Sequence, residues 1–336
     1  MKVLVYGAGV IGCYLAHVLC SAGNDVTLLA RGAWKDTLER DGLVIRHSLQ
    51  RKTAIDHPRI ISTVNDAAYD AVFAVMQHGQ MWAALDALAA VDSPLVALVG
   101  NNLSAPEMEA KIREKSPGKT ILFGFQATGG NREKGKVECA RFGGGKMTLG
   151  RLHSEASPAE KETIKALFAG TKYQLVWTPD MDGWLKTHMA FILPTVYLCY
   201  TVNCDLRKAT KAQRKAILEA AIEGEQLLKL LGIPILPAGE EESYTGVRRK
   251  GVEAMLFIMA KTKIGELAAT DHCRHAVAEM EGLEQAWNEL RAQKPDYHMP
   301  HWDALRSAMP DWSLLHQQYI DGSVFGLLLK GERDCE

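Results

Sequence analysis

A glycine-rich turn near the start of the chain constrains the fold more than any other feature. An apolar run, residues 3–6, leads directly into Gly7-x-Gly9-x-x-Gly12, and apolar residues at helical spacing follow. This order predicts a buried parallel strand, a tight turn and a helix. The glycines allow the turn, the approach of a pyrophosphate and close helix packing, in that order. The sequence thus predicts a dinucleotide site at the helix N-terminus, formed by Gly7, Ala8, Gly9, Val10, Ile11 and Gly12.

The residue that follows the second predicted strand, at 26–30, selects between NAD and NADP. An NAD site usually has Asp or Glu about 20 residues beyond the glycines to bind the ribose 2′-hydroxyl, whereas an arginine there suits the 2′-phosphate of NADP. This chain has Arg31 and no carboxylate at that point. The alternative is a solvated arginine in the following loop. The pattern favours NADP (NADPH) as the cofactor.

Composition narrows the class of protein. A chain of 336 residues, 47% hydrophobic and 24% charged, is long enough for two ordinary globular domains. A net charge of −1 argues against nucleic acid or an anionic membrane as a partner. The longest apolar stretch, residues 189–200, contains Pro194 and is shorter than the ~20 residues that span a bilayer. A small-molecule substrate is the natural expectation.

The seven cysteines indicate the compartment. They form no C-x-x-C pair and no metal-ligand spacing with histidine, so we expect reduced thiols, no metal site and a cytoplasmic location. The first strand follows Met1 directly, and we expect no signal peptide. The cysteines are Cys13, Cys20, Cys139, Cys199, Cys204, Cys273 and Cys335.

Strand and helix patterns alternate over the first 125 residues, which predicts an α/β fold with a Rossmann-type parallel sheet covered on both faces. The predicted strands are 3–6, 26–30, 71–75, 95–99 and 120–123, and the predicted helices are 11–22, 81–90 and 105–114. Strands at 137–141 and 146–149, joined by a glycine turn at 143–145, and a helix at 158–169 extend this domain.

Long helical patterns begin near residue 180 and cover roughly 180–204, 207–231, 241–262 and 267–293. The predicted organisation is therefore a dinucleotide-binding domain, residues 1–178, and an all-helical substrate and dimerisation domain, residues 179–336. The tail from residue 309 has scattered aromatic residues and glycines and receives no assignment.

Together these features resemble the ketopantoate reductase (2-dehydropantoate 2-reductase) family over nearly the whole chain. The resemblance rests on the glycine turn, Arg31, Asn101 after the fourth strand, a glycine-rich strand pair near 130–150, and Trp184-Leu-Lys186 at the first long helix. It implies a 6-phosphogluconate dehydrogenase-like fold, in which a helical domain follows the Rossmann-type domain. It also implies NADPH-dependent reduction of 2-dehydropantoate to pantoate, a step of pantothenate biosynthesis. A homodimer is expected by analogy of fold alone.

The resemblance implies that Lys186 is the general acid. Hydride delivery to a 2-oxo carbon builds negative charge on the carbonyl oxygen, which an ammonium group can stabilise and protonate. The alternative is a surface lysine that begins a helix.

The resemblance also implies that two amide side chains lie near the cofactor. Asn101 matches an asparagine that lies between the nicotinamide ribose and the substrate in the family, although it could instead cap the helix at 105. Gln77 stands where the family usually has a lysine near the cofactor.

The second domain departs from the family in several places. Ala190 and Pro194 replace asparagines that line the family's site, and residues 253–258 do not match its substrate-holding Ser-Ser-Met-Leu-Gln-Asp segment. Glu279 aligns with the family's substrate-binding glutamate, and His275, one turn earlier, is predicted to share its helix face and to contact the substrate. The alternative for His275 and Glu279 is an exposed helical pair.

The sequence therefore predicts an NADPH-dependent reductase of a small 2-oxo acid, with ketopantoate as the family default. One alternative is a reductase of another 2-oxo acid or of an imine. Another is a non-catalytic protein that senses NADPH, which the loss of the two asparagines favours and the presence of Lys186 opposes.

Overall fold

The chain forms two compact units in a computed structural model, which describes residues 1–64 and 66–319. The first unit is Met1–Leu185 and the second begins at Lys186. Cys335 and the part of the predicted tail beyond residue 319 lie outside the described residues. A Rossmann-type α/β unit followed by a helical unit confirms the predicted fold class.

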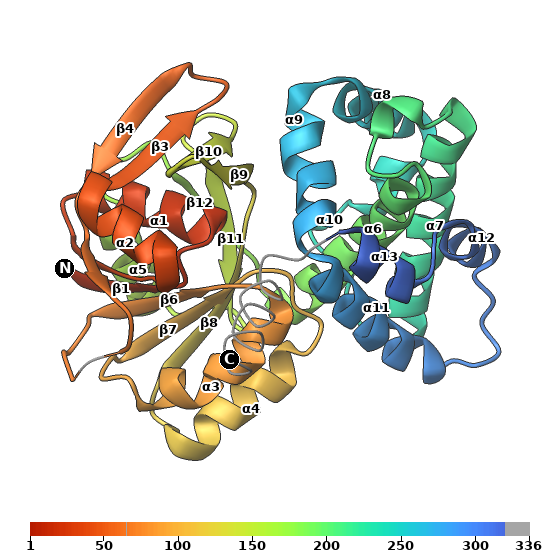
Figure 1. The fold of residues 1–336 in the computed structure, drawn as a ribbon. Coiled ribbons are helices and arrows are strands. Elements are labelled where there is room, and N and C mark those ends of the chain that lie inside the picture. The colour runs from red at the N-terminus through yellow and green to blue at the C-terminus, as the bar shows by residue number, and fades with distance from the viewer. Residues whose placement is uncertain (65, 320–336) are drawn as a thin grey trace, which may run out of the picture. The chain divides into compact units, whose positions relative to one another are not determined.

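An eight-stranded sheet organises the first unit (Figure 1). Its strand order is β12-β11-β8-β7-β6-β1-β2-β5, and neighbouring strands are parallel except for the antiparallel pair of β8 and β11. The predicted strands within residues 1–125 are all present. The bounds are β1 (Lys2–Tyr6), β2 (Asp25–Leu29), β5 (Arg59–Ile61), β6 (Ala71–Val75), β7 (Leu95–Val99), β8 (Thr120–Gln126), β11 (Lys146–Gly150) and β12 (Gln174–Trp177).

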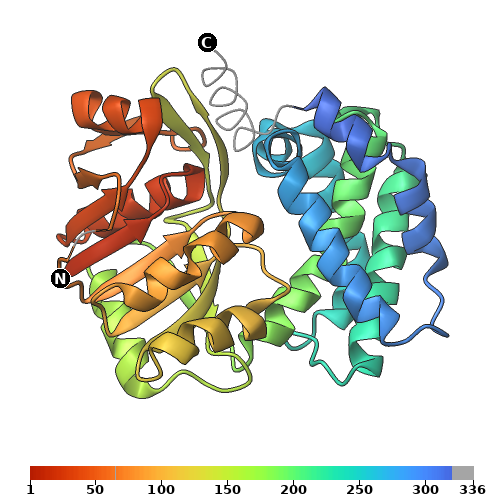
Figure 2. The same ribbon diagram turned by 60° about the horizontal axis from the view of Figure 1, so that its bottom comes forward.

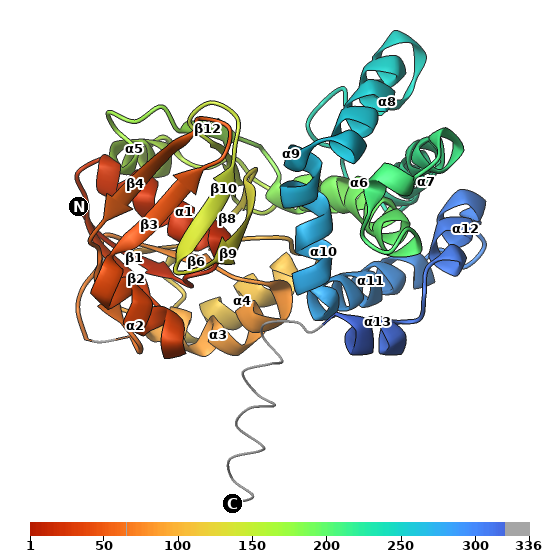
Figure 3. The ribbon, with the colours of Figure 1, turned by 45° about the horizontal axis from the view of Figure 1, so that its top comes forward.

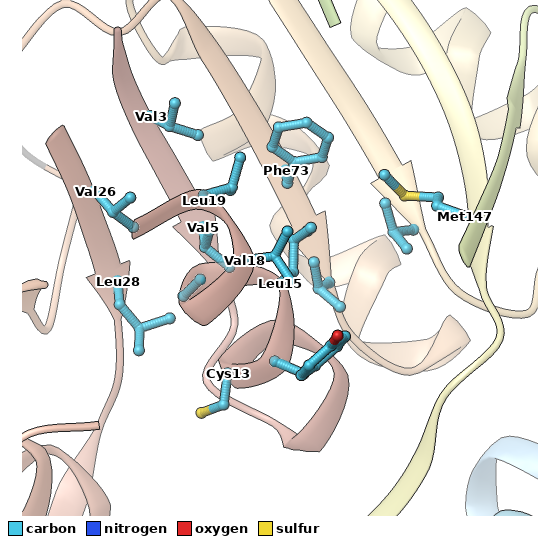
Figure 4. Close-up of a cluster of buried hydrophobic side chains, with 14 of the residues drawn as sticks. Val3, Val5, Cys13, Leu15, Val18, Leu19, Val26, Leu28, Phe73 and Met147 are labelled. Carbon is cyan, nitrogen blue, oxygen red and sulfur yellow. The ribbon is translucent and has the colours of Figure 1, made fainter. Parts of the chain in front are cut away.

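Helices cover both faces of this sheet, and the alternation of side chains along β1 shows why. Val3 and Val5 belong to a core with α1 (Val10–Ser21) and α5 (Pro158–Leu167), shown in Figure 4. Leu4 and Tyr6 point to the other face, into a core with α3 (His78–Ala90) and α4 (Ala105–Lys115). Figure 2 shows α3 and α4 side by side. The short helix α2 (Gly32–Asp41) was not predicted, because its sequence is polar and it buries only Leu38.

A second, four-stranded sheet corrects the predicted strand pair near 130–150. Its order is β4-β3-β10-β9, so β10 pairs with β3 and β9, whereas β11 belongs to the large sheet. The glycine turn at 143–145 therefore passes the chain from one sheet to the other. A Cβ at Gly145 would lie 2.9 Å from the ring of Tyr14, so only glycine fits this close crossing. The bounds are β3 (Leu43–His47), β4 (Lys52–Asp56), β9 (Gly129–Glu133) and β10 (Lys136–Ala140).

In the described part of the second unit, all regular secondary structure is helical. One predicted helix, 267–293, is wrong as a continuous element, because the backbone leaves the helix at Ala276 (φ −141°, ψ 35°). The α-helices are α6 (Met181–Thr201), which begins in the first unit, α7 (Lys211–Leu230), α8 (Gly246–Lys261), α9 (Lys263–Gly265), α10 (Asp271–His275), α11 (Val277–Ala292), α12 (Pro300–Ala308) and α13 (Trp312–Gln318). Short 3-10 turns lie at Leu206–Lys208 and Glu241–Tyr244, and a π-helical turn at Glu266–Thr270.

Aromatic rings and buried carboxylates hold the last helices in place. Trp302 of α12 stacks on Trp287 of α11 with 4.8 Å between ring centres. Trp312 of α13 donates from Nε1 to Glu284 at 2.6 Å. These contacts explain helices that the sequence did not predict, because each depends on a partner far along the chain. Across residues 1–64 and 66–319, no helix combines the length and the apolar character needed to cross a bilayer.

Candidate active site

The predicted cofactor residues of the first unit meet at one edge of the large sheet. Strands β2, β1, β6 and β7 are parallel neighbours, so their carboxyl ends lie at the same edge. The chain runs from β1 to its neighbour β2 on one side, and later returns to form β6 on the other side of β1. The strand order therefore reverses at β1, and ligands bind at such a topological switch point. The glycine turn follows β1, Arg31 follows β2, Gln77 follows β6 and Asn101 follows β7.

Two of the three glycines are required by the fold itself. Gly7 has φ +119°, and a Cβ there would lie 2.2 Å from the carbonyl oxygen of Val75 on β6. A Cβ at Gly12 would lie 1.9 Å from the carbonyl oxygen of Gly7. Both distances are far inside van der Waals contact. These positions hold the turn tightly against β6 and bring α1 close to β1.

Gly9 has a different role, because it faces open space. It is the N-cap of α1 with φ −71° and ψ −176°, a backbone conformation open to any residue, and a Cβ there would meet nothing within 4 Å. The first turn of α1 carries no acidic residue to balance the positive end of its dipole. A bare N-terminal turn of this kind fits a pyrophosphate, which would fill the space in front of Gly9.

Arg31 is exposed at the carboxyl end of β2, where it forms the N-cap of α2. Its Nε donates to the carbonyl oxygen of Ser62 at 3.5 Å, which leaves the guanidinium beside the strand end. The adenosine ribose of a dinucleotide lies at this point in Rossmann-type sites. The arginine is therefore placed where a 2′-phosphate would need it.

Two asparagines, Asn101 and Asn102, lie in the turn after β7, and they differ in burial. Gly100 has φ +154°, and a Cβ there would lie 2.9 Å from the carbonyl oxygen of Met76 after β6. Asn102 is buried, and its Oδ1 accepts from the backbone N–H of Ser104, the N-cap of α4, at 2.8 Å. Asn102 thus holds the backbone just before α4. Asn101 is half-buried and follows β7 by two residues.

Gln77 is half-buried and forms the N-cap of α3. This position lies at the carboxyl end of β6, next in the sheet to the glycine turn. An amide here can donate or accept a hydrogen bond, whereas the lysine expected from the family would also bring a charge.

In the second unit, Lys186 lies near the start of α6 and is 7% exposed. It is therefore not the freely solvated surface lysine of the alternative interpretation. Its neighbour Thr187 accepts from the backbone N–H of Leu236 at 3.1 Å, which anchors the loop after α7 to α6. Burial lowers the pKa of His188 to about 4, so this imidazole is neutral and belongs to the packing of the helix.

Glu279 is buried in the first turn of α11, but the continuous helix that placed His275 one turn before it on the same face is wrong. The helix breaks at Ala276, and the Nδ1 of His275 lies 2.7 Å from the carbonyl oxygen of Asp271. Instead, Nε2 of His272 lies 3.3 Å from Oε2 of Glu279. The sequence carries no glycine or proline at the break, so nothing signalled this change of partner.

The two positions where the family has asparagines are used for packing. Ala190 is 1% exposed, and a Cβ at Gly224 of α7 would lie 3.0 Å from its Cβ. A larger polar side chain at 190 would disturb this close approach of α6 and α7. Pro194 is buried inside α6. The first unit thus assembles the glycine turn, Arg31, Gln77 and Asn101, and the second carries Lys186 and Glu279.

Metal ligands are not gathered anywhere in the part of the chain that the structure describes: no group of three or more His, Cys, Asp or Glu side chains is arranged to hold an ion. A glycine turn at the switch point of a parallel sheet is the arrangement typical of Rossmann-type dinucleotide sites. Residues 3–154 match the model of the family described as ketopantoate reductase PanE/ApbA. The matched segment makes up less than half of the chain, and over this segment the chain is similar to that family.

Individual proteins are similar to the chain over most of its length. The uncharacterized oxidoreductase YkpB of Bacillus subtilis (strain 168) is 23% identical over 280 residues, which cover 81% of this chain and 89% of YkpB. The structure of 2-dehydropantoate 2-reductase from Geobacter metallireducens GS-15 has a TM-score of 0.70 at 17% identity, over 92% of this chain and 98% of that one. A ternary structure of D-mandelate dehydrogenase with NADH and anilino(oxo)acetate has a TM-score of 0.69 at 15% identity. The match covers 95% of this chain and 99% of that one. At these identities the structural likeness establishes the fold.

Proposed function

We propose that the chain is an NADPH-dependent reductase of a small 2-oxo acid. The observation that carries this proposal is the bare glycine turn at the switch point, with Arg31 and no carboxylate at the end of the adjacent strand. The turn supplies a pyrophosphate site and Arg31 a partner for the 2′-phosphate. When bound, the nicotinamide supplies the hydride that goes to the carbonyl carbon.

Lys186 is the proton donor in this proposal. As the carbonyl carbon gains a hydride, its oxygen becomes negative, and the ammonium of Lys186 stabilises that charge and transfers one proton to the oxygen. The product is the 2-hydroxy acid and a neutral lysine, which solvent reprotonates. Asn101 orients the substrate and ribose by hydrogen bonds, and Glu279 accepts one from a substrate hydroxyl.

The packing of the second unit supports a second candidate for the substrate class. Ketopantoate is the family default, but Ala190 is committed to packing against Gly224 and offers no polar contact. This favours a 2-oxo acid with a more apolar substituent as a second candidate. The solved complex of D-mandelate dehydrogenase with NADH and anilino(oxo)acetate, a protein of similar fold, supports including such a candidate.

A substrate panel tests the proposal. We expect the purified chain to oxidise NADPH with at least one compound among 2-dehydropantoate, branched aliphatic 2-oxo acids and phenylglyoxylate. Simple aldehydes without a carboxylate serve as the control, and cyclic imines test the alternative reaction. Turnover of apolar 2-oxo acids without turnover of 2-dehydropantoate would identify the second candidate. A chain that binds NADPH but reduces none of these compounds would support the sensor and contradict the reductase.

Arg31 provides a separate test of the cofactor. We expect Arg31→Gln to weaken NADPH binding by about 10- to 100-fold, because a charge-assisted contact to the 2′-phosphate is lost. NADH binding should change less than about threefold, since NADH has no such phosphate. Both affinities are measured by titration of nicotinamide fluorescence, with Arg40→Gln, an exposed arginine on the same helix, as the matched control. Equal losses for the two cofactors would show that Arg31 does not read the 2′-phosphate.

A further inference from the structure

An arginine–tryptophan pair lies beside the glycine turn on residues to which the proposed function gives no role. The guanidinium carbon of Arg132, on β9, lies 5.1 Å from the ring centre of Trp34. Its Nη1 donates to the carbonyl oxygen of Ala8 at 3.3 Å. Trp34 belongs to the first turn of α2, three residues after Arg31, and Ala8 lies inside the glycine turn. Arg132 thus joins the two segments that would hold the pyrophosphate and the 2′-phosphate.

The charge of Arg132 is held in place without being neutralised. Among residues 1–64 and 66–319, no carboxylate forms an ion pair with it, and its only hydrogen bond is the one to Ala8. The side chain is exposed, and a guanidinium has five N–H donors. Burial raises the pKa of the Cys13 thiol on α1 to about 12, and the cation of Arg132 opposes that rise. The positive field of Arg132 therefore reaches the first turn of α1.

The backbone of β9 fixes this position. Gly130 has φ +159°, and a Cβ there would lie 3.0 Å from Cγ1 of Val10, the first residue of α1. At the other end of the hairpin, a Cβ at Gly135 would lie 3.5 Å from Thr37 of α2. Figure 3 shows β9 and β10 alongside α1. The β9–β10 hairpin therefore spans from the start of α1 to α2 and carries Arg132 over the turn.

We propose that Arg132 binds the pyrophosphate of the dinucleotide, as a cationic partner to the N-terminus of α1. The inference rests on the proposed function, since it assigns a further residue to the same cofactor site. A pyrophosphate at the glycine turn lies next to Ala8, whose carbonyl already holds one Nη of Arg132. The remaining N–H donors are suited to two parallel hydrogen bonds with one phosphate. Stacking on Trp34 restrains the guanidinium before the cofactor arrives, which reduces the entropic cost of binding.

Binding of NADPH and NADH to an Arg132→Gln variant tests this role. We expect both cofactors to lose about 10- to 100-fold in affinity, and by the same factor, because both contain the pyrophosphate. Binding should also become less sensitive to salt, since one of the charges that salt screens is gone. Arg46→Gln is the matched control, because Arg46 is an exposed arginine on β3 of the same small sheet. Arg132→Lys, which keeps the charge but not the planar fork, should fall between the wild type and Arg132→Gln.

The outcomes separate this inference from the proposed function. A wild type that binds neither cofactor overturns both. A wild type that binds NADPH, with Arg132→Gln as tight as Arg46→Gln at an unchanged unfolding midpoint, overturns the role of Arg132 alone. A loss confined to NADPH would also overturn it, because such a loss would place Arg132 at the 2′-phosphate.

Discussion

Replacing Lys186 by alanine is expected to lower kcat for 2-oxo acid reduction by about 10²- to 10⁴-fold, the range typical of a lost general acid. The Kd for NADPH should stay within about threefold of the wild type, because the predicted cofactor contacts all lie in the first unit. The measurement is steady-state turnover on the best substrate of the panel, together with a fluorescence titration of NADPH. Lys211→Ala, which removes an exposed lysine at the start of α7, is the matched control.

A second substitution separates the proton of Lys186 from its charge. Lys186→Arg keeps a cation, but a guanidinium does not give up its proton near neutral pH. If Lys186 only stabilises the oxyanion, Lys186→Arg should recover much of the activity with an unchanged pH profile. If it donates the proton, the arginine variant should stay within about tenfold of Lys186→Ala. Wild-type turnover by Lys186→Ala would remove Lys186 from the reaction.

The large sheet could be predicted because its central strands are apolar along their whole length. Strands β6 and β7 are buried at every position, as parallel strands covered on both faces must be. Gln77 and Asn101 follow these two strands, so the order along the chain was sufficient to place both residues at the carboxyl edge of the sheet. Local geometry and strand order were sufficient for this half of the site.

Only one strand of the small sheet, β10, was predicted, and β9 and β4 carry little hydrophobic signal. The sequence of β9 is Gly-Gly-Asn-Arg-Glu, without an apolar side chain, and β4 is partly or fully exposed at each position. These strands form because β10 brings a buried Val137 and Cys139 against α1, and the others pair with it. The residue of the further inference, Arg132, lies on such a strand.

The second unit shows the limit of arguments from spacing. The pairing of His275 with Glu279 assumed a continuous helix, and one residue outside the helix, Ala276, moved the contact to His272. From the sequence alone, Ala190 is only the loss of a polar side chain that the family has at this position. The structure explains the alanine, because Gly224 approaches it closely. Both results depend on long-range packing, which a single sequence does not encode in any local pattern.

Two alanine substitutions in the glycine turn should differ in their effect on stability and agree in their effect on cofactor affinity. For Gly12→Ala we expect the free energy of unfolding to fall by about 2–4 kcal/mol, because its Cβ would lie 1.9 Å from the Gly7 carbonyl and backbone would have to move. For Gly9→Ala we expect a change within about 0.5 kcal/mol, since its backbone is extended and its Cβ meets only open space.

NADPH affinity should fall by at least about 10-fold in both variants, because the Cβ added by Gly9→Ala would occupy the space of the pyrophosphate and Gly12→Ala displaces the turn that binds it. Denaturant unfolding without cofactor, which avoids stabilisation by the ligand, and NADPH titration measure the two effects separately. Gly118→Ala is the control, because Gly118 is likewise exposed and open but lies in the turn after α4, at the opposite end of the strands. If Gly9→Ala bound NADPH as tightly as Gly118→Ala, the pyrophosphate would not bind in the open space in front of Gly9. If Gly9→Ala instead lost as much stability as Gly12→Ala, Gly9 would serve the fold rather than the ligand.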